Sequence, residues 1–450
     1  MRKENKMGVM PVPRLVLTMS VPIMISMLVQ SMYNIVDSIF VARISEAALT
    51  ATSLAYSAQI LQIAVAVGTG VGMNALVSRK LGAKDFAGAN EAATTGLLLT
   101  VLRSLIFVLW GLTGSRAFIR AFIDDPVILD YGTAYLQICQ VWATGIFLGT
   151  FFQRLLQATG RTLSSMFAQM AGAVVNLILD PILIFGYFGC PAMGIAGAAI
   201  ATVIGQWAAA LLGLILHRSL NREVRFVFRG FRLKKEHIAA IYRVGAPTIL
   251  TQAFGSIMVA LMNLVLIVFS STAVAFFGVY FKLQSFLFMP LNGLGQGSLP
   301  IVGFNYGARN LPRIEQTWKT TVRFGLFLAA IGAVVFLALP GQLLDAFSAS
   351  ADMKALGIPA LRIICIGFLP ASVTMMIGYA VSGLGNGMVN LISTALRQCV
   401  VLIPLVYFFG RLGGIDVIWF SFWIAEACAA IYAAVQLRCR MKAVRRELAG

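Results

Sequence analysis

The sequence predicts an all-α membrane protein of twelve transmembrane helices, in two six-helix lobes related by a pseudo-two-fold axis along the membrane normal. Three observations lead to this fold class. Of 450 residues, 59% are hydrophobic and only 12% are charged, which lies far outside the range of soluble globular proteins. Long apolar runs recur along the whole chain, and the glycine and proline positions of the first half return in the second half.

Twelve apolar runs are each long enough to cross a hydrocarbon core of about 30 Å as a helix. The first run is too long for a signal-peptide core and no small-residue cleavage site ends it, so we expect it to be retained as a helix. The predicted spans cover residues 15–41, 52–77, 91–113, 130–153, 162–186, 194–217, 243–269, 272–300, 316–339, 358–383, 390–410 and 414–437.

The distribution of the basic residues predicts the orientation of these spans. If the N-terminus is cytoplasmic, 26 of the 35 Lys and Arg fall on inner segments or inner helix ends, Arg397 among them. Six fall on the outer side, and three (Arg103, Lys282 and Arg323) lie within spans. This is the positive-inside pattern, which puts both termini in the cytoplasm. The net charge of +18 is thereby explained by topology and attraction to anionic lipid, and we expect no nucleic-acid partner.

An internal duplication divides the chain into two halves that enter the membrane in the same direction. At an offset of 225 residues, Pro22 pairs with Pro247, Gln59 with Gln284, and the glycines at 68, 70 and 72 with those at 293, 295 and 297. We therefore expect an N-terminal lobe (1–217), a basic cytoplasmic linker (218–242) and a C-terminal lobe (243–450), the usual plan of an alternating-access carrier. The alternative is that duplication only built a large helical bundle.

Polar residues inside the spans mark a candidate ion site. Ser26, Gln30, Asn34 and Asp37 form one stripe on the first span, and Ser165, Gln169, Gly172, Asn176 and Asp180 form another on the fifth. Thr202 lies in the outer half of the sixth span, at a similar depth. An ionised carboxylate inside a membrane costs about 2.5 to 3.5 kcal/mol, so such acids are commonly functional.

Two carboxylates, an amide and a hydroxyl suit two chemical roles. Two neighbouring carboxylates in a poorly hydrated pocket resist double ionisation, so one can bind and release a proton. The same oxygen ligands suit a hard cation such as Na⁺, bound by Asp37, Asn176 and Asp180. A static buried network that only joins these helices is the remaining alternative. Neither acid is repeated, because at the same offset Asp37 aligns with Met262 and Asp180 with Leu405, so we expect any coupling chemistry in the first half alone.

The residues that would line a substrate cavity are less specific. Glu426 is a third acid within a span and could bind a cationic substrate or a second proton, or be satisfied by a neighbouring helix. Aromatic, thioether and amide groups at helical spacing could supply an adaptable surface for bulky amphipathic compounds, although such residues more often belong to a core. The candidates are Gln30, Tyr33, Asn34, Tyr56, Gln59, Met258, Met262, Lys282, Gln284, Met376 and Glu426.

Signatures of catalysis or of a bound cofactor are missing from the sequence. The six cysteines are scattered without a CxxC or Cys/His cluster, and no P-loop occurs. Both histidines, His217 and His237, fall in the basic linker region. We therefore expect a protein that is not an enzyme and carries no cofactor.

Several motifs together resemble the multidrug and toxic compound extrusion (MATE) family of prokaryotes. They are Gln30-Ser-Met-Tyr-Asn-Ile-Val-Asp37, Gly68-Thr-Gly-Val-Gly72, Leu156-Gln-Ala-Thr-Gly-Arg161, Asn176 with Asp180-Pro181, and Gly194-Ile-Ala-Gly-Ala-Ala-Ile-Ala-Thr202. The resemblance implies export of organic cations or amphipathic drugs coupled to inward H⁺ or Na⁺, with two lobes around a central cavity. In the most similar branch, the acid of helix 1 and the Asn/Asp pair of helix 5 form the ion site; these positions are Asp37, Asn176 and Asp180 here.

The other branch of that family also has acids on helices 7 and 10, which this sequence lacks, so the resemblance supports no sodium site in the second lobe. We expect a monomer in the cytoplasmic membrane, with small-molecule drugs as substrates and membrane lipid around it. The alternative function is a lipid-linked precursor flippase or polysaccharide exporter of the same superfamily. That function favours several cations in the cavity, whereas the spans offer only Lys282 and Arg103 for it.

Overall fold

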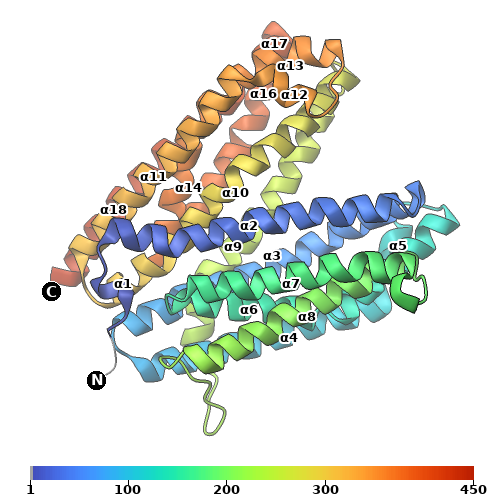
Figure 1. The fold of residues 1–450 in the computed structure, drawn as a ribbon. Helices are drawn as coiled ribbons and strands as arrows, with labels where there is room; N and C mark the ends of the chain where they lie inside the picture. Colours follow the sequence, from blue (N-terminus) through green and yellow to red (C-terminus); the bar gives the residue numbers. More distant parts are fainter. Residues whose placement is uncertain (1–3, 450) are drawn as a thin grey trace. The chain divides into compact units, whose positions relative to one another are not determined.

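The computed structural model describes residues 4–449, and within them the chain consists of helices and turns without a β-strand (Figure 1). The helices of the first half are α1 (Lys6–Val9), α2 (Val12–Ala42), α3 (Glu46–Gly82), α4 (Phe86–Arg120), α5 (Pro126–Val141), α6 (Thr144–Ala158), α7 (Thr162–Phe185), η1 (Tyr187–Gly189) and α8 (Gly194–Leu220). The second half continues with α9 (Lys235–Leu266), α10 (Ser271–Gly307), α11 (Leu311–Ala338), α12 (Pro340–Asp345), α13 (Ala351–Ile364), η2 (Cys365–Gly367), α14 (Phe368–Gly383), α15 (Met388–Ala395), η3 (Leu396–Val400), α16 (Leu402–Gly413), α17 (Ile415–Ile418) and α18 (Phe420–Ala449).

The predicted membrane class is confirmed, with one correction to the spans. Among the described residues, eleven helices are long and apolar enough to cross a membrane, and a bent pair, α5 with α6, makes up to twelve. The fourth predicted span, 130–153, is therefore not one straight helix: it bends by 48° between Val141 and Thr144. At the bend the Ala143 N–H donates to the Gln140 carbonyl at 3.0 Å, a tighter turn than an α-helix makes.

The chain divides into two compact units. The first unit is Ile25–Gly245, and the second unit contains the residues up to Met24 together with those from Ala246 onward. The expected lobes keep each helix whole, whereas the two units divide α2 between Met24 and Ile25 and α9 between Gly245 and Ala246. The N-terminal part of α2 packs within the second unit, where the Ser20 hydroxyl donates to the Leu294 carbonyl at 3.2 Å. The N-terminal part of α9 belongs to the first unit.

A close helix contact recurs in both units and is consistent with the duplication. In the first unit, a Cβ on Gly72 of α3 would lie 2.1 Å from the Ile241 carbonyl oxygen of α9. In the second unit, a Cβ on Gly297 of α10 would lie 2.4 Å from the Ser20 hydroxyl of α2. Gly72 and Gly297 are 225 residues apart, so the repeated glycines serve the same packing in each half.

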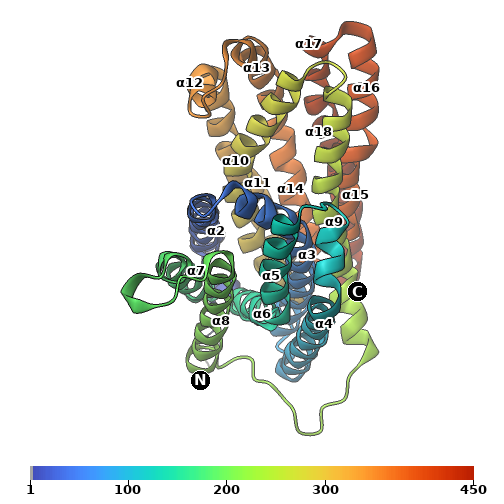
Figure 2. The same cartoon turned by 90° about the vertical axis from the view of Figure 1, so that its right-hand side faces the viewer.

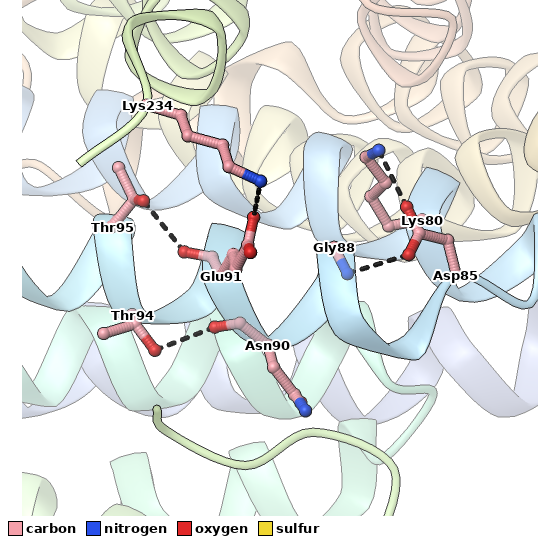
Figure 3. Close-up of polar contacts among 8 residues, drawn as sticks. All are labelled: Lys80, Asp85, Gly88, Asn90, Glu91, Thr94, Thr95 and Lys234. Carbon is pink, nitrogen blue, oxygen red and sulfur yellow. Dashed lines mark hydrogen bonds and ion pairs between the residues drawn. The ribbon is translucent and has the colours of Figure 1, made fainter. Parts of the chain in front are cut away.

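Segment 221–234 connects α8 to α9 as a loop without regular secondary structure (Figure 2). The backbone N–H groups of Arg225 and Val227 donate to the side chains of Asn90 (2.7 Å) and Thr94 (3.0 Å) on α4. Farther along, the Lys234 ammonium lies 2.6 Å from the Glu91 carboxylate, as Figure 3 shows. The expected basic linker is thus a short segment held against α4 by polar contacts.

The turn between α3 and α4 has its own polar support in the same view. Asp85 caps α4 by accepting the Gly88 N–H at 2.8 Å, and it pairs with the Lys80 ammonium at 2.8 Å (Figure 3). The Lys80 hydrogen bond and the Gly88 N–H lower the pKa of the Asp85 carboxyl below its usual value. Asp85 therefore stays ionised and fixes the start of α4.

Candidate functional site

The two predicted polar stripes meet within the first unit. The side-chain amide of Asn176 donates to Asp180 Oδ1 at 3.3 Å and to Thr202 Oγ1 at 3.4 Å, which joins α7 to α8. The carboxyl groups of Asp37 on α2 and Asp180 on α7 lie within interaction distance of each other. The structure thus brings together all four residues predicted for the ion site.

Two glycines allow α7 and α8 to approach closely enough for these bonds. A Cβ on Gly172 would lie 2.7 Å from the Gly205 carbonyl oxygen, and a Cβ on Gly205 would lie 2.7 Å from the Gly172 carbonyl oxygen. Such mutual approach of backbones is typical of small residues at membrane helix crossings. Because Asn176 lies one turn beyond Gly172, the crossing carries its amide to Thr202.

Three oxygen atoms of this cluster are buried acceptors without a donor. Asp37 Oδ1, Asn176 Oδ1 and Asp180 Oδ2 have no hydrogen-bond partner among the residues that the structure describes. Asn176 and Asp180 are 3% and 0% exposed, so bulk water does not reach them freely. Unpaired buried acceptors cost free energy, and a proton or a hard cation would satisfy them. Within residues 4–449 no group of three or more His, Cys, Asp or Glu side chains gathers.

Two further residues lie at this cluster that were not predicted from the sequence. Tyr135 of α5 lies beside Gln59 and Thr202, and Cys139, one turn later, lies beside Gln59 and Tyr135. Tyr135 and Cys139 are both buried, at 5% and 3% exposure. Their positions one helical turn apart on a face with few other polar groups were the only signal in the sequence that could have found them.

A chain of side-chain amides extends from the cluster along the first unit. Gln153 of α6 donates to Gln169 of α7, and Gln169 donates to Gln30 of α2. Tyr33 lies three residues after Gln30 and four before Asp37 on α2, on the same face of that helix. The two predicted stripes are therefore joined side chain to side chain over several helical turns.

The other cavity candidates fall into two groups. Exposed or partly exposed are Asn34, Tyr56, Gln59, Lys282 and Gln284. The methionines Met258, Met262 and Met376 are 5%, 0% and 1% exposed and lie in hydrophobic cores of the second unit. A substrate would reach these three side chains only after the core around them had rearranged.

Glu426 has a partner that the sequence did not indicate. Arg397 Nη1 donates to Glu426 Oε1 at 3.0 Å, joining η3 to α18 within the second unit. Arg397, which the charge distribution assigned to an inner helix end, is the tenth of the 26 residues of the span Met388–Gly413. Of the alternatives left open for Glu426, a neighbouring helix does supply its counter-ion.

Comparison with known proteins agrees with the fold and the repeat. The MatE family model matches residues 22–182 and again 247–408, and the two matches begin 225 residues apart. The chain is 24% identical to the multidrug export protein MepA of Staphylococcus haemolyticus, over 92% of this chain and 90% of that protein. It is 25% identical to MepA of Staphylococcus saprophyticus, over 95% of both chains.

Solved structures are similar over nearly the whole length. An outward-facing multidrug resistance MATE family transporter of the MOP superfamily superposes with a TM-score of 0.92 at 25% identity, covering 99% of both chains. A MOP superfamily transporter from Pyrococcus furiosus, described by the reverse polarity of its binding pocket, gives 0.91 at 25% identity, covering 98% of this chain and 99% of that one. The two-lobe fold is thereby confirmed, and the family match over both halves shows that this chain belongs to the MatE family of transporters.

Proposed function

We propose that this protein exports organic cations or other amphipathic drugs across the prokaryotic cytoplasmic membrane, in exchange for inward H⁺ or Na⁺, by alternating access. The observation that carries the proposal is the set of three buried acceptors, Asp37 Oδ1, Asn176 Oδ1 and Asp180 Oδ2. The printed names of the relatives, multidrug export proteins, support the same class of substrate.

The proposed cycle follows from the charge of this cluster. Two adjacent carboxylates without a nearby cation repel each other, and an entering H⁺ or Na⁺ relieves that repulsion. Because Asp37 lies on α2 and Asp180 on α7, ion binding draws these helices together and ion release lets them part. An ion that binds one arrangement better shifts the protein toward it, which couples the ion to the exposure of a substrate site.

The flippase alternative needs cations that can hold a pyrophosphate. Arg103 lies in the first unit with its guanidinium 4.3 Å from the centre of the Tyr242 ring, so it is engaged in a stacking contact. Lys282 lies on α10 in the second unit, where no described residue forms an ion pair with it. No observation favours the alternative, and we retain the exporter.

Transport into proteoliposomes tests the proposal directly. Purified protein would be reconstituted, and the movement of a fluorescent organic cation measured under an imposed pH gradient, an imposed Na⁺ gradient, or neither. We expect uphill movement under one gradient only, which also identifies the coupling ion. Absence of gradient-driven movement under both conditions, with protein that is folded and correctly inserted, would overturn the proposed function.

A further inference from the structure

The second unit contains a buried ion pair that the coupling chemistry does not use. Arg397 and Glu426 have side chains only 12% and 14% exposed, and both lie within membrane spans. Gly367 of η2 lies beside the acid, because a Cβ there would be in ordinary contact with Glu426 Cγ at 3.6 Å. Isolated charges at this depth are expensive, so an arginine kept here needs a role that a hydrophobic residue cannot fill.

The local helix geometry at Arg397 is also unusual. Residues Leu396–Val400 form a π-helical turn, in which the Val401 N–H donates to the Leu396 carbonyl at 3.0 Å. Such single wide turns within longer helices occur frequently at functional sites, because they displace a side chain from the regular helical register. Here the side chain carried by the wide turn is the guanidinium.

Only one edge of the guanidinium is occupied. Nη1 donates to Glu426 Oε1, whereas Nε and Nη2 make no hydrogen bond with any described residue and are not fully enclosed. The Nε and Nη2 groups point along the same edge, which is the fork that binds a carboxylate through two parallel hydrogen bonds. Unsatisfied N–H groups facing hydrocarbon would be costly, so this edge faces a polar space or a ligand.

The surroundings favour a carboxylate on an aromatic compound. The Arg397 guanidinium carbon lies 5.8 Å from the centre of the Phe288 ring, so an aromatic face lies next to the guanidinium. Glu426 brings the net charge of the pair to zero, so the site has no excess positive charge to offset the desolvation of a dianionic phosphate, which costs more than that of a singly charged carboxylate. A ligand that also carries a cationic group fits the substrate class of the proposed exporter.

We propose that the free edge of the Arg397 guanidinium, held in place by Glu426, binds the carboxylate of zwitterionic amphipathic substrates. This inference rests on the proposed function only where it calls the ligand a transported substrate. The binding itself does not require transport. Glu426 is a positioning residue, because it holds the guanidinium and its second oxygen, Oε2, is buried without a partner among the described residues.

Equilibrium binding to purified protein in detergent tests this site independently of transport. The probes are a fluorescent aromatic amine that bears a free carboxylate and its methyl ester, which differ only in the proposed contact. We compare wild type with the double variant Arg397→Gln/Glu426→Gln, which removes both charges together. Arg103→Gln, which removes the membrane cation of the first unit, is the matched control.

We expect the double variant to lose about tenfold or more in affinity for the carboxylate, the size of a charge-assisted hydrogen bond, and little for the ester. Arg103→Gln should keep the wild-type ratio of the two affinities. If the double variant does not fold, Arg397→Lys preserves the charge but not the fork, and we expect it to lower the carboxylate-to-ester affinity ratio. An unchanged ratio in the folded variant would overturn the inference. Failure of transport with an intact affinity ratio would count against the proposed function alone.

Discussion

The two units share a sequence repeat, but the buried acids of one unit lack partners that the buried acid of the other unit has. In the first unit, Asp37 and Asp180 lie together, and oxygen atoms of both lack a donor among the described residues. In the second unit, Glu426 is held by Arg397 at 3.0 Å. An acid pair without a cation has oxygen atoms that an arriving ion could satisfy, whereas the carboxylate of Glu426 already has a counter-ion. The comparison shows that the two units share a glycine packing contact but differ in the partners of their buried acids.

The largest expected effect is the loss of export when either acid of the first unit is replaced by its amide. Asp37→Asn and Asp180→Asn should each reduce gradient-driven export of a fluorescent cation to the level of protein-free vesicles, because one carboxylate no longer binds the ion. Each variant should be at least as thermally stable as wild type in detergent, since the repulsion between the carboxylates is removed. Retained coupled export by either variant would contradict the assignment of the site.

In the second unit, replacing the buried acid by its amide should lower thermal stability, which is the opposite of the effect expected in the first unit. Glu426→Gln leaves the Arg397 guanidinium without its counter-ion, and removing one partner of a buried pair costs about 3 to 5 kcal/mol. We expect a markedly lower midpoint of thermal unfolding in detergent. The double variant Arg397→Gln/Glu426→Gln should recover most of the loss, and no recovery would show that the pair does not act as a unit.

Alanine at the repeated glycines compares the packing of the two units. Gly72→Ala places a methyl group 2.1 Å from the Ile241 carbonyl oxygen, and Gly297→Ala places one 2.4 Å from the Ser20 hydroxyl oxygen and 2.7 Å from the Ser20 Cα, so in both units the backbones must move apart. Overpacking costs about 1 to 3 kcal/mol, and we expect a loss of this size in both variants, because the repeated glycines make the same kind of contact. Unfolding midpoints of the two variants, measured side by side, check this expectation; a loss in only one variant would mean that the two contacts do not support the two units alike.

The smallest predicted effect lies outside the membrane, at the start of α4. Asp85→Ala removes the cap and should destabilise the first unit by about 1 kcal/mol. The pKa of Asp85 is lowered in the folded protein, so its contribution is complete above the unfolded value of about 4 and is lost as pH falls through the folded pKa. Stability of wild type and variant should therefore differ at pH 7 and converge in acid; a difference that persists at low pH would point to packing instead of charge.

The sequence predicted the features that depend on local pattern. Apolar run length identified the spans, and helical spacing put Asn176 and Asp180 on one face. The bend near Trp142 was not predicted, because no proline or glycine stands at residues 142 and 143. The ion pair of Arg397 with Glu426 was not predicted, because the two residues are 29 positions apart in the sequence and their contact depends on how η3 packs against α18. Tyr135 and Cys139 escaped for the same reason, since a hydroxyl or thiol on an apolar helix acquires meaning only from its neighbours.

The central claim is that ion coupling belongs to the first unit alone, and the ion-to-substrate ratio tests it most directly. Uptake of the coupling ion and export of a cationic substrate without a carboxylate would be measured together in the same proteoliposomes. We predict that Arg397→Gln/Glu426→Gln keeps the wild-type ratio, while Asp180→Asn takes up no coupling ion. A lower ratio in the double variant, or ion uptake that survives in Asp180→Asn, would contradict the account.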